Sequence, residues 1–181
     1  MRVYTIGHST RPLEEFLALL RGAGTTVLVD VRIAPGSRRH PQFAGPALAQ
    51  ALAGSGIEYL HLQDLGGRRR PRRDSPHRAW RVEAFRGYAD HMETPAFDAA
   101  LDRVIARAAK ETVTLMCAEA VPWRCHRRLI ADALTVRGVE VVHLTGPSRS
   151  ARHALPPFAR VEGTRVIYDV GETPLWRPQS G

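Results

Sequence analysis

Both cysteines of the chain lie in one stretch, LMCAEAVPWRCHRRLI (115–130), together with a carboxylate and an imidazole. Cys117 ends an apolar run, Glu119 follows it, and Cys125 and His126 stand just before a segment of helical periodicity. Thiolates act as nucleophiles and bind metals, and carboxylates and imidazoles transfer protons. The stretch therefore presents three alternatives: a reactive thiol, a metal site, or a buried strand end followed by an ordinary helix.

The first two alternatives each resemble a known chemistry only in part. A strand-end cysteine before a helix is typical of thiol-dependent phosphatases and rhodaneses, where backbone N–H groups bind an oxyanion. However, Arg124 lies one residue too far from Cys117 for a phosphatase loop, and Glu119 would repel the anion. Zinc is the second alternative, because Cys117, Cys125 and His126 would supply three ligands in an arrangement similar to that of zinc deaminases.

The third alternative is structural, because cysteine is commonly buried as a small hydrophobe. It is the interpretation that we favour for Cys117. We therefore expect Glu119 and His126, rather than the thiols, to transfer protons, with Cys117 and His8 as further catalytic candidates.

The surrounding sequence predicts a single α/β domain over residues 1–181. Short apolar runs alternate with helical stripes, so the strands should be parallel. We predict a mostly parallel sheet of about five strands flanked by helices, with a C-terminal β-hairpin around Glu162-Gly163. The core covers about 3–145, followed by a tail at 150–181, and a basic loop lies at 66–78. The predicted strands are 3–7, 26–31, 57–62, 113–117 and 139–144.

Open parallel sheets bind ligands at the carboxyl ends of their strands, and polar residues follow each predicted strand. We expect these residues to gather along one edge as an anion-binding cleft. Two alternatives stay open: Asp30 and Arg32 as an internal ion pair, and His8 with Ser9 as a simple turn. The predicted substrate-binding residues are Ser9, Asp30, Arg32, Ser37, Gly66, Gly67, Tyr88, Cys125 and Arg127.

The chain is strongly basic, with a formal net charge of +8. This charge favours anionic partners, although Lys110 is the only lysine and such an arginine bias also follows from GC-rich coding DNA. The loop at 66–78 is predicted to be exposed, either as a solvated surface or as a contact to nucleic-acid phosphates. Trp80, Phe85 and Tyr88 would then stack on bases or, as we favour, belong to the core. The candidate nucleic-acid-binding residues are Arg68, Arg69, Arg70, Arg72 and Arg73.

The number of cysteines and the length of the apolar runs indicate the cellular compartment of the protein. Two cysteines do not make a disulfide scaffold, and no apolar run has the length of a signal peptide core or a membrane span. We expect a cytoplasmic protein with reduced thiols, no membrane association and no cofactor, zinc being the one alternative. Its expected partner is an anionic small molecule or nucleic acid, and the sequence gives no oligomeric state.

Five motifs occur in one order: YTIGHS, DVR followed by PGS, YLHL-x-x-LGG, FRGYADHM, and CAE-x-x-P-x-x-CHR. Together, over about residues 3–145, they resemble the domain-of-unknown-function 488 family of bacterial and archaeal proteins. The resemblance implies a small α/β domain without an established activity. The matching positions are Gly7, His8, Ser9, Asp30, Arg32, Ser37, Gly66, Gly67, Gly87, Tyr88, Cys117, Glu119, Cys125, His126 and Arg127.

The sequence leaves open whether the protein is an enzyme. The leading hypothesis is an enzyme for an anionic, nucleotide or nucleic-acid-linked substrate, with Arg32 and Arg127 holding the anion and His8 and Ser9 orienting the substrate. A nucleic-acid-binding module without chemistry, using the arginine loop, is the first alternative. A zinc-binding protein is the second.

Overall fold

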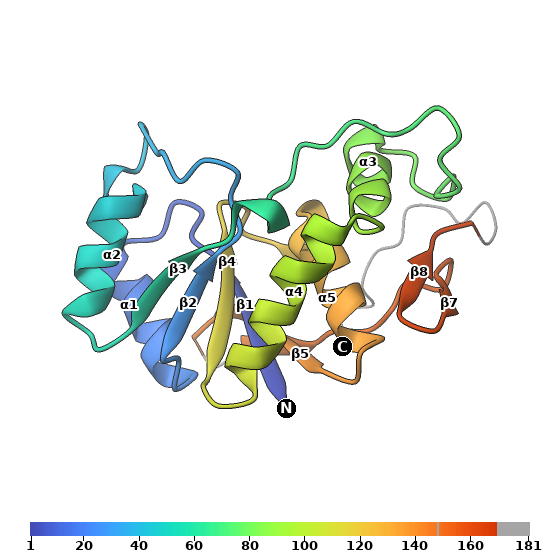
Figure 1. Cartoon of the computed structure of the whole chain (residues 1–181). Coiled ribbons are helices and arrows are strands. Elements are labelled where there is room, and N and C mark those ends of the chain that lie inside the picture. Colours follow the sequence, from blue (N-terminus) through green and yellow to red (C-terminus); the bar gives the residue numbers. More distant parts are fainter. Residues whose placement is uncertain (148, 170–181) are drawn as a thin grey trace.

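The computed structural model describes residues 1–147 and 149–169. A six-stranded sheet in the order β3-β2-β4-β1-β5-β6 runs through the molecule (Figure 1). The first five strands are parallel, and β6 pairs antiparallel with β5 at one edge. The strands are β1 (Arg2–Gly7), β2 (Val27–Asp30), β3 (Glu58–His61), β4 (Val113–Cys117), β5 (Glu140–Gly146) and β6 (Arg149–Arg152).

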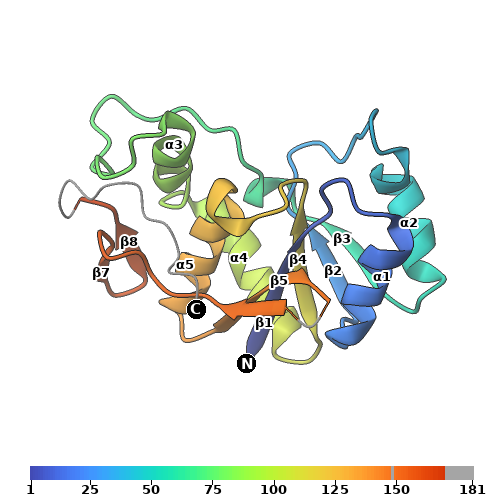
Figure 2. The same ribbon diagram turned by 180° about the vertical axis from the view of Figure 1, so that it is seen from behind.

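Helices cover both faces of the sheet (Figures 1 and 2). On one side α1 (Leu13–Gly22) and α2 (Gly45–Ala53) enclose a core that includes Phe16 and Leu48. On the other side α4 (Pro95–Ala108) and α5 (Arg127–Thr135) enclose a second core. The helix α3 (Glu83–His91) lies above α5, toward the carboxyl ends of the strands. The 3-10 helices are η1 (Pro41–Phe43), η2 (Gln63–Leu65) and η3 (Pro122–Arg124).

The predicted α/β class, the five parallel strands and the hairpin are confirmed. The hairpin is formed by β7 (Arg160–Glu162) and β8 (Arg165–Ile167), and Gly163 supplies the left-handed turn residue with φ of 62°. The sequence did not predict β6, because all four of its residues are exposed and carry no apolar alternation. Residues 170–181 of the predicted tail lie outside the described residues.

The topology contains a switch point, between β1 and β4, of the kind at which open α/β sheets bind ligands. The chain leaves β1 toward α1 on one face and leaves the neighbouring β4 toward α5 on the other face. The loops that follow these two strands therefore diverge. In open α/β sheets such a switch point is where ligands bind, outside the carboxyl ends of the strands. Gly7 and Cys117, which are paired in register, end the two strands at this point.

Candidate functional site

The structure brings the predicted segments together at the carboxyl end of the sheet. The backbone N–H of His8 donates to the carbonyl of Cys117 at 3.0 Å, and that of Ser9 donates to Ala118 at 2.9 Å. Across β4, the His126 ring contacts the carbonyl of Val31 at 3.0 Å. The ends of β1, β2 and β4 and the start of α5 thus share one region.

The two thiols are in direct contact. The sulfur atoms of Cys117 and Cys125 lie 2.7 Å apart, outside the disulfide bond length of about 2.05 Å, and both cysteines are free and buried. They are 2% and 3% exposed. The residues that flank them in sequence, Glu119, Trp123 and Arg124, are exposed. The pair therefore belongs to the apolar core, directly below exposed residues of the connecting segment.

His126 has one ring nitrogen fixed by the backbone. A carbonyl oxygen only accepts hydrogen bonds, so the contact to Val31 requires a proton on Nε2 of His126. In the neutral ring Nδ1 is then unprotonated, and it lies 3.7 Å from Sγ of Cys125. A cysteine facing the free nitrogen of an imidazole that a third group orients is the arrangement of an activated thiol nucleophile.

Arg127 is a buried cation without a carboxylate partner. It is 1% exposed, and its guanidinium donates to Sγ of Cys117 at 3.1 Å and to the carbonyl of Glu119 at 2.6 Å. Within the described chain, none of its hydrogen-bond acceptors is a carboxylate. Because burial of an uncompensated charge is costly, the neighbouring thiols are the groups placed to supply the negative charge.

The surroundings shift the pKa values of the two thiols in opposite directions. Burial, together with the hydrogen bond to Cys125, raises the pKa of Cys117 well above its ordinary value. Burial also acts to raise the pKa of Cys125, but the hydrogen bonds to Cys117 and His126 and the charge of Arg127 outweigh it and lower that pKa well below its ordinary value.

Zinc at Cys117, Cys125 and His126 stays a prediction. Two thiolates on a tetrahedral zinc lie about 3.8 Å apart, given Zn–S distances of about 2.3 Å, whereas Cys117 and Cys125 are at 2.7 Å. In the described part of the chain, no three His, Cys, Asp or Glu side chains form a group suited to a metal ion.

Glycines allow the close approach at this site. A Cβ on Gly7 would lie 1.7 Å from the carbonyl oxygen of Glu119, and one on Gly67 would lie 2.7 Å from Nδ1 of His126. Tyr88 also packs against the imidazole, with ring centroids 5.1 Å apart, and donates to the carbonyl of Leu65 at 2.7 Å. Gly67 and Tyr88 therefore hold His126 in place, as positioning residues.

Asp30 and Arg32 form the internal ion pair that the sequence left open. Nη2 of Arg32 contacts Asp30 at 2.5 Å and the carbonyl of Phe43 at 2.9 Å, and Tyr59 donates to Asp30 at 2.8 Å. Both members of the pair are buried. His8 stacks on Phe43, and burial lowers its pKa to about 4. These contacts stabilise the ends of β1 and β2.

The remaining predicted residues occupy varied positions. Ser37 accepts from the backbone N–H of His40 within its loop, and Gly66 packs against Ile33. Glu119 is exposed and its carboxylate makes no contact within the described chain. Ser9 is half-buried with a left-handed φ of 48°.

A buried hydrogen-bond chain that the sequence did not reveal extends from Arg127. Its guanidinium contacts Oγ1 of Thr5 at 3.4 Å, and Thr5 contacts His143 at 2.7 Å. His143 then contacts His153 at 2.9 Å, and His153 contacts Asp132 at 2.7 Å. With Asp132 ionised and both histidines neutral, every hydrogen bond points from the guanidinium toward the carboxylate. Tyr168 also donates to this carboxylate, at 2.7 Å.

No motif marks this chain, because its members come from β1, α5, β5 and two later segments. Burial lowers the pKa of His143 to about 3, so this histidine is neutral at neutral pH. The chain joins the Arg127 cation to the Asp132 anion without a direct ion pair. We refer to Thr5, His143, His153, Asp132 and Tyr168 as the buried relay.

The predicted arginine loop divides into two groups. Arg69 donates to the carbonyl of Gly66, and Arg72 pairs with Glu93 at 2.8 Å. Arg68, Arg70 and Arg73 are exposed. The aromatic residues Trp80, Phe85 and Tyr88 pack in the core, as favoured from the sequence. The exposed aromatic side chain near this edge is Trp123, which the sequence analysis missed.

A surface depression lies at the opposite end of the sheet and contains no predicted site residue. Its lining residues are Thr26, Ala108, Lys110, Glu111 and Thr112. At the carboxyl end, the side chains of Asp30, Arg32, His126 and Arg127 contact other protein groups. The predicted anion-binding cleft therefore stays a prediction.

Comparisons with known proteins identify the family of the chain. No curated protein and no solved structure matches the chain. Among the described residues, no helix combines the length and apolarity needed to cross a membrane. The family model "Domain of unknown function DUF488" matches residues 12–134, which is more than half of the chain. The match contains Asp30, Arg32 and the whole stretch from Cys117 to Arg127, and the chain therefore belongs to the DUF488 family.

Proposed function

We propose that this protein is a thiolate-dependent enzyme that acts on an anionic substrate at the carboxyl ends of β1 and β4. One observation carries the proposal: Sγ of Cys125 contacts Cys117, at 2.7 Å, and Nδ1 of His126, at 3.7 Å, beside a buried arginine whose hydrogen-bond acceptors in the described chain include no carboxylate. This differs in emphasis from the sequence-based expectation, which gave proton transfer to Glu119 and His126, favoured a structural role for Cys117 while keeping it as a catalytic candidate, and named Cys125 as substrate-binding.

Each neighbour of Cys125 has a distinct task. The S–H of Cys117 and the backbone N–H of Arg127, at 3.5 Å, donate to the Cys125 thiolate. The guanidinium of Arg127 supplies the positive charge that keeps a thiolate stable under burial. His126 holds the proton that Cys125 has lost and can return it to a leaving group.

The proposed reaction has two balanced steps. The Cys125 sulfur bonds to the electrophilic atom of the substrate while the bond to the leaving group breaks, and the leaving group takes the proton from the His126 imidazolium. Water then attacks the sulfur-linked intermediate and gives one proton to Nδ1 of His126, which releases the product and restores the thiolate. We propose that the exposed carboxylate of Glu119 assists this proton transfer, as expected from the sequence.

The thiolate is tested by its ultraviolet absorbance in reduced protein as the pH is varied. We expect one thiolate whose midpoint lies below the ordinary thiol pKa of about 8.5. Cys125→Ser should raise that midpoint or abolish the transition, and His126→Gln should raise it by about one unit. His61→Gln is the matched control, because His61 also contacts a backbone carbonyl at this edge, at 2.7 Å, without facing a thiol. Two thiols that both titrate in the ordinary range would overturn the proposal.

Turnover is tested with a panel of nucleotides, phosphate esters and carboxylate-bearing esters. We expect hydrolysis of at least one class, lost in Cys125→Ser and reduced in Glu119→Gln. Turnover that survives Cys125→Ser would assign the chemistry to another group. A low-pKa thiolate without turnover on any of these classes would reject the enzymatic part alone.

A further inference from the structure

Besides Arg72, Arg78 and Arg81, which are also exposed in the loop between β3 and α3, six exposed arginines surround the carboxyl end of the sheet. None of these six has a side-chain hydrogen bond or ion pair within the described residues. Two lie between β2 and α2, three between β3 and α3, and one in η3, and both long loops stand at the same end of the molecule (Figure 1). We call these residues the arginine surface: Arg38, Arg39, Arg68, Arg70, Arg73 and Arg124.

The loop that carries half of this surface has an anchored backbone. The N–H of Arg72 donates to Asp90 at 2.8 Å, and a Cβ on Gly87 would lie 2.3 Å from the carbonyl oxygen of Arg69. Ser75 and His77, further along the loop, are buried. The backbone is thus fixed at several points while the arginine side chains project outward. Neighbouring cations repel one another, and a polyanion relieves this repulsion.

An exposed aromatic ring stands beside the arginines. Trp123 is 39% exposed and precedes Arg124 in η3. Trp80 and Phe85, by contrast, pack against each other with ring centroids 5.1 Å apart. Arginines that follow a phosphate backbone, next to an aromatic ring on which a base stacks, are typical of single-strand nucleic-acid binding.

We infer that the arginine surface binds single-stranded nucleic acid, with the guanidinium groups on phosphates and Trp123 stacked on a base. The contacts to phosphate are independent of base sequence. This inference adds a partner beyond the proposed function and rests on the surface alone, so it stands or falls separately from the thiolate chemistry.

The test compares two variants of equal charge change. The carboxyl-end variant carries Arg38→Gln, Arg39→Gln, Arg70→Gln and Arg73→Gln. The amino-end variant carries Arg2→Gln, Arg21→Gln, Arg107→Gln and Arg152→Gln, whose side chains pair with Glu140, Glu14, Glu58 and Glu111 at the other end of the sheet. Binding of a fluorescein-labelled single-stranded RNA is measured by anisotropy over a salt series, and circular dichroism checks folding.

We expect the carboxyl-end variant to lose about 100-fold in affinity and its salt slope to fall by about 3, because each lost contact to a single strand removes about 0.7 from the slope. The amino-end variant should bind within a few-fold of wild type. Equal losses in both variants, or no binding by the wild-type protein at low salt, would overturn the inference.

Trp123→Ala tests the single-strand preference. We expect it to weaken binding of the single strand about 10-fold and to leave the salt slope unchanged. A duplex of the same sequence that binds more tightly than the single strand and ignores Trp123→Ala contradicts the assignment. Binding to phosphatidylserine vesicles that the RNA does not displace would identify a membrane instead.

Cys125→Ser separates this inference from the proposed function. We expect it to bind the RNA like wild type, because Cys125 is buried below the surface. Loss of binding in Cys125→Ser would place the RNA contact at the thiol pair instead of at the arginine surface.

Discussion

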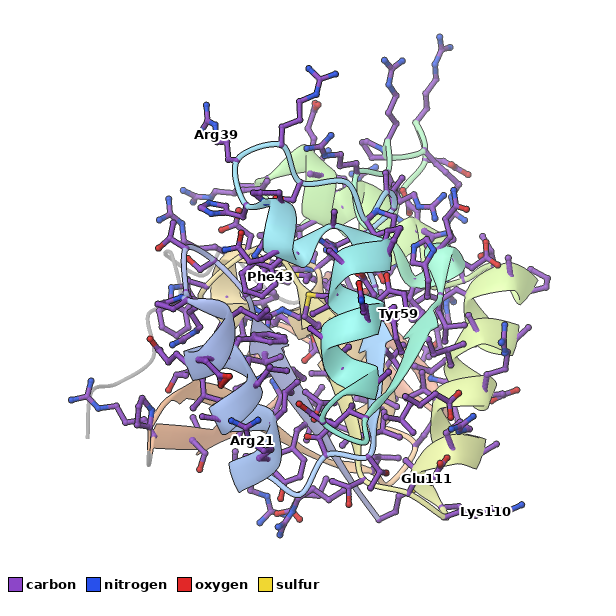
Figure 3. All side chains as sticks on the ribbon, turned by 90° about the vertical axis from the view of Figure 1, so that its left-hand side faces the viewer. Arg21, Arg39, Phe43, Tyr59, Lys110 and Glu111 are labelled. Atoms are coloured by element: carbon purple, nitrogen blue, oxygen red, sulfur yellow. The ribbon has the colours of Figure 1, made fainter. Side chains whose placement is uncertain are left out.

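The two ends of the sheet carry arginine in different ways. At the amino end, Arg2 pairs with Glu140 at 2.7 Å, Arg21 pairs with Glu14 at 3.4 Å, and Arg107 pairs with Glu58. At the carboxyl end, the arginine surface has no such partners within the described chain. Figure 3 shows this separation, with Arg39 projecting from one end and Arg21, Lys110 and Glu111 at the other.

This difference shows that the position of an arginine in the fold decides whether a carboxylate neutralises its charge. A compositional bias explains how many arginines a chain has, but it does not explain why the residues of the arginine surface lack carboxylates while Arg32 and Arg72, at the same end, have them. Backbone strain is concentrated at the same end. Within the described residues, the non-glycine positions with left-handed φ are Ser9, at 48°, and Arg68, at 60°. Strained residues persist where the surrounding structure fixes them, commonly at functional sites.

The largest difference in stability is expected between two glycine-to-alanine substitutions, one at each end of the sheet. Gly7→Ala places a Cβ 1.7 Å from a backbone oxygen, so the ends of β1 and β4 must separate, and we expect a loss of at least about 4 kcal/mol in the free energy of unfolding. Gly22→Ala, at the amino end, meets nothing within 4 Å and should stay within about 1 kcal/mol of wild type. Urea denaturation measures both. Similar stabilities for the two variants would show that the carboxyl end is not tightly packed.

A smaller effect is expected from breaking one ion pair at each end. Asp30→Asn leaves Arg32 buried without its anion and should cost about 3 kcal/mol of unfolding free energy. Glu58→Gln removes an exposed partner of Arg107 and should leave the denaturant midpoint unchanged, because exposed ion pairs contribute little. If Glu58→Gln proved the more damaging, the amino-end pairs would be the structural ones.

The two ends should also lose stability at different pH. Burial lowers the pKa of His8 to about 4 and of His143 to about 3, from an ordinary 6.5. Between pH 6.5 and about 4 the unfolded chain therefore binds more protons than the native one, so the free energy of unfolding falls with falling pH. Each histidine contributes about 1.4 kcal/mol per pH unit within its window.

At the amino end, hydrogen bonds from Arg107 and Arg2 lower the pKa of Glu58 and Glu140. These two carboxylates therefore reduce the free energy of unfolding only when the pH falls below their ordinary pKa of 4.5. Combining His8→Gln with His143→Gln should flatten the stability curve above pH 4.5, while Glu58→Gln should not. Chemical denaturation from pH 7 to 4 distinguishes them, and a wild-type slope in the double variant would exclude the histidines as its cause.

Much of the fold was predictable because its elements have local patterns. The run TVLVDV is apolar at nearly every position, as a strand covered on both faces must be, and the structure places β2 there. Thr94 and Pro95 mark the start of α4, where the Thr94 side chain accepts from the N–H of Phe97. The exposed strand β6 has no such pattern and was missed.

The meeting of the predicted segments at one edge followed from the sequence, but the contacts between their side chains did not. Strand ends meet wherever strands are parallel, so Cys117, His126 and Asp30 had to share one edge. Which nitrogen of His126 faces Cys125 depends on the carbonyl of Val31, which no sequence spacing reveals. The buried relay joins residues as distant in the chain as Thr5 and Tyr168, so only the folded structure identifies it.

The position of β1 in the sheet has a consequence for biosynthesis. This strand is made first, yet its hydrogen-bonding neighbours come late, since Val3 pairs with Val113 on one side and with Val141 on the other. An emerging chain can pair β2 with β3, but the middle of the sheet stays open until β4 and β5 have been made. Such distant contacts slow folding. A ribosome-bound chain that ends before β4 therefore has neither the switch point nor the thiol pair, and both arise only when the domain closes around its first strand.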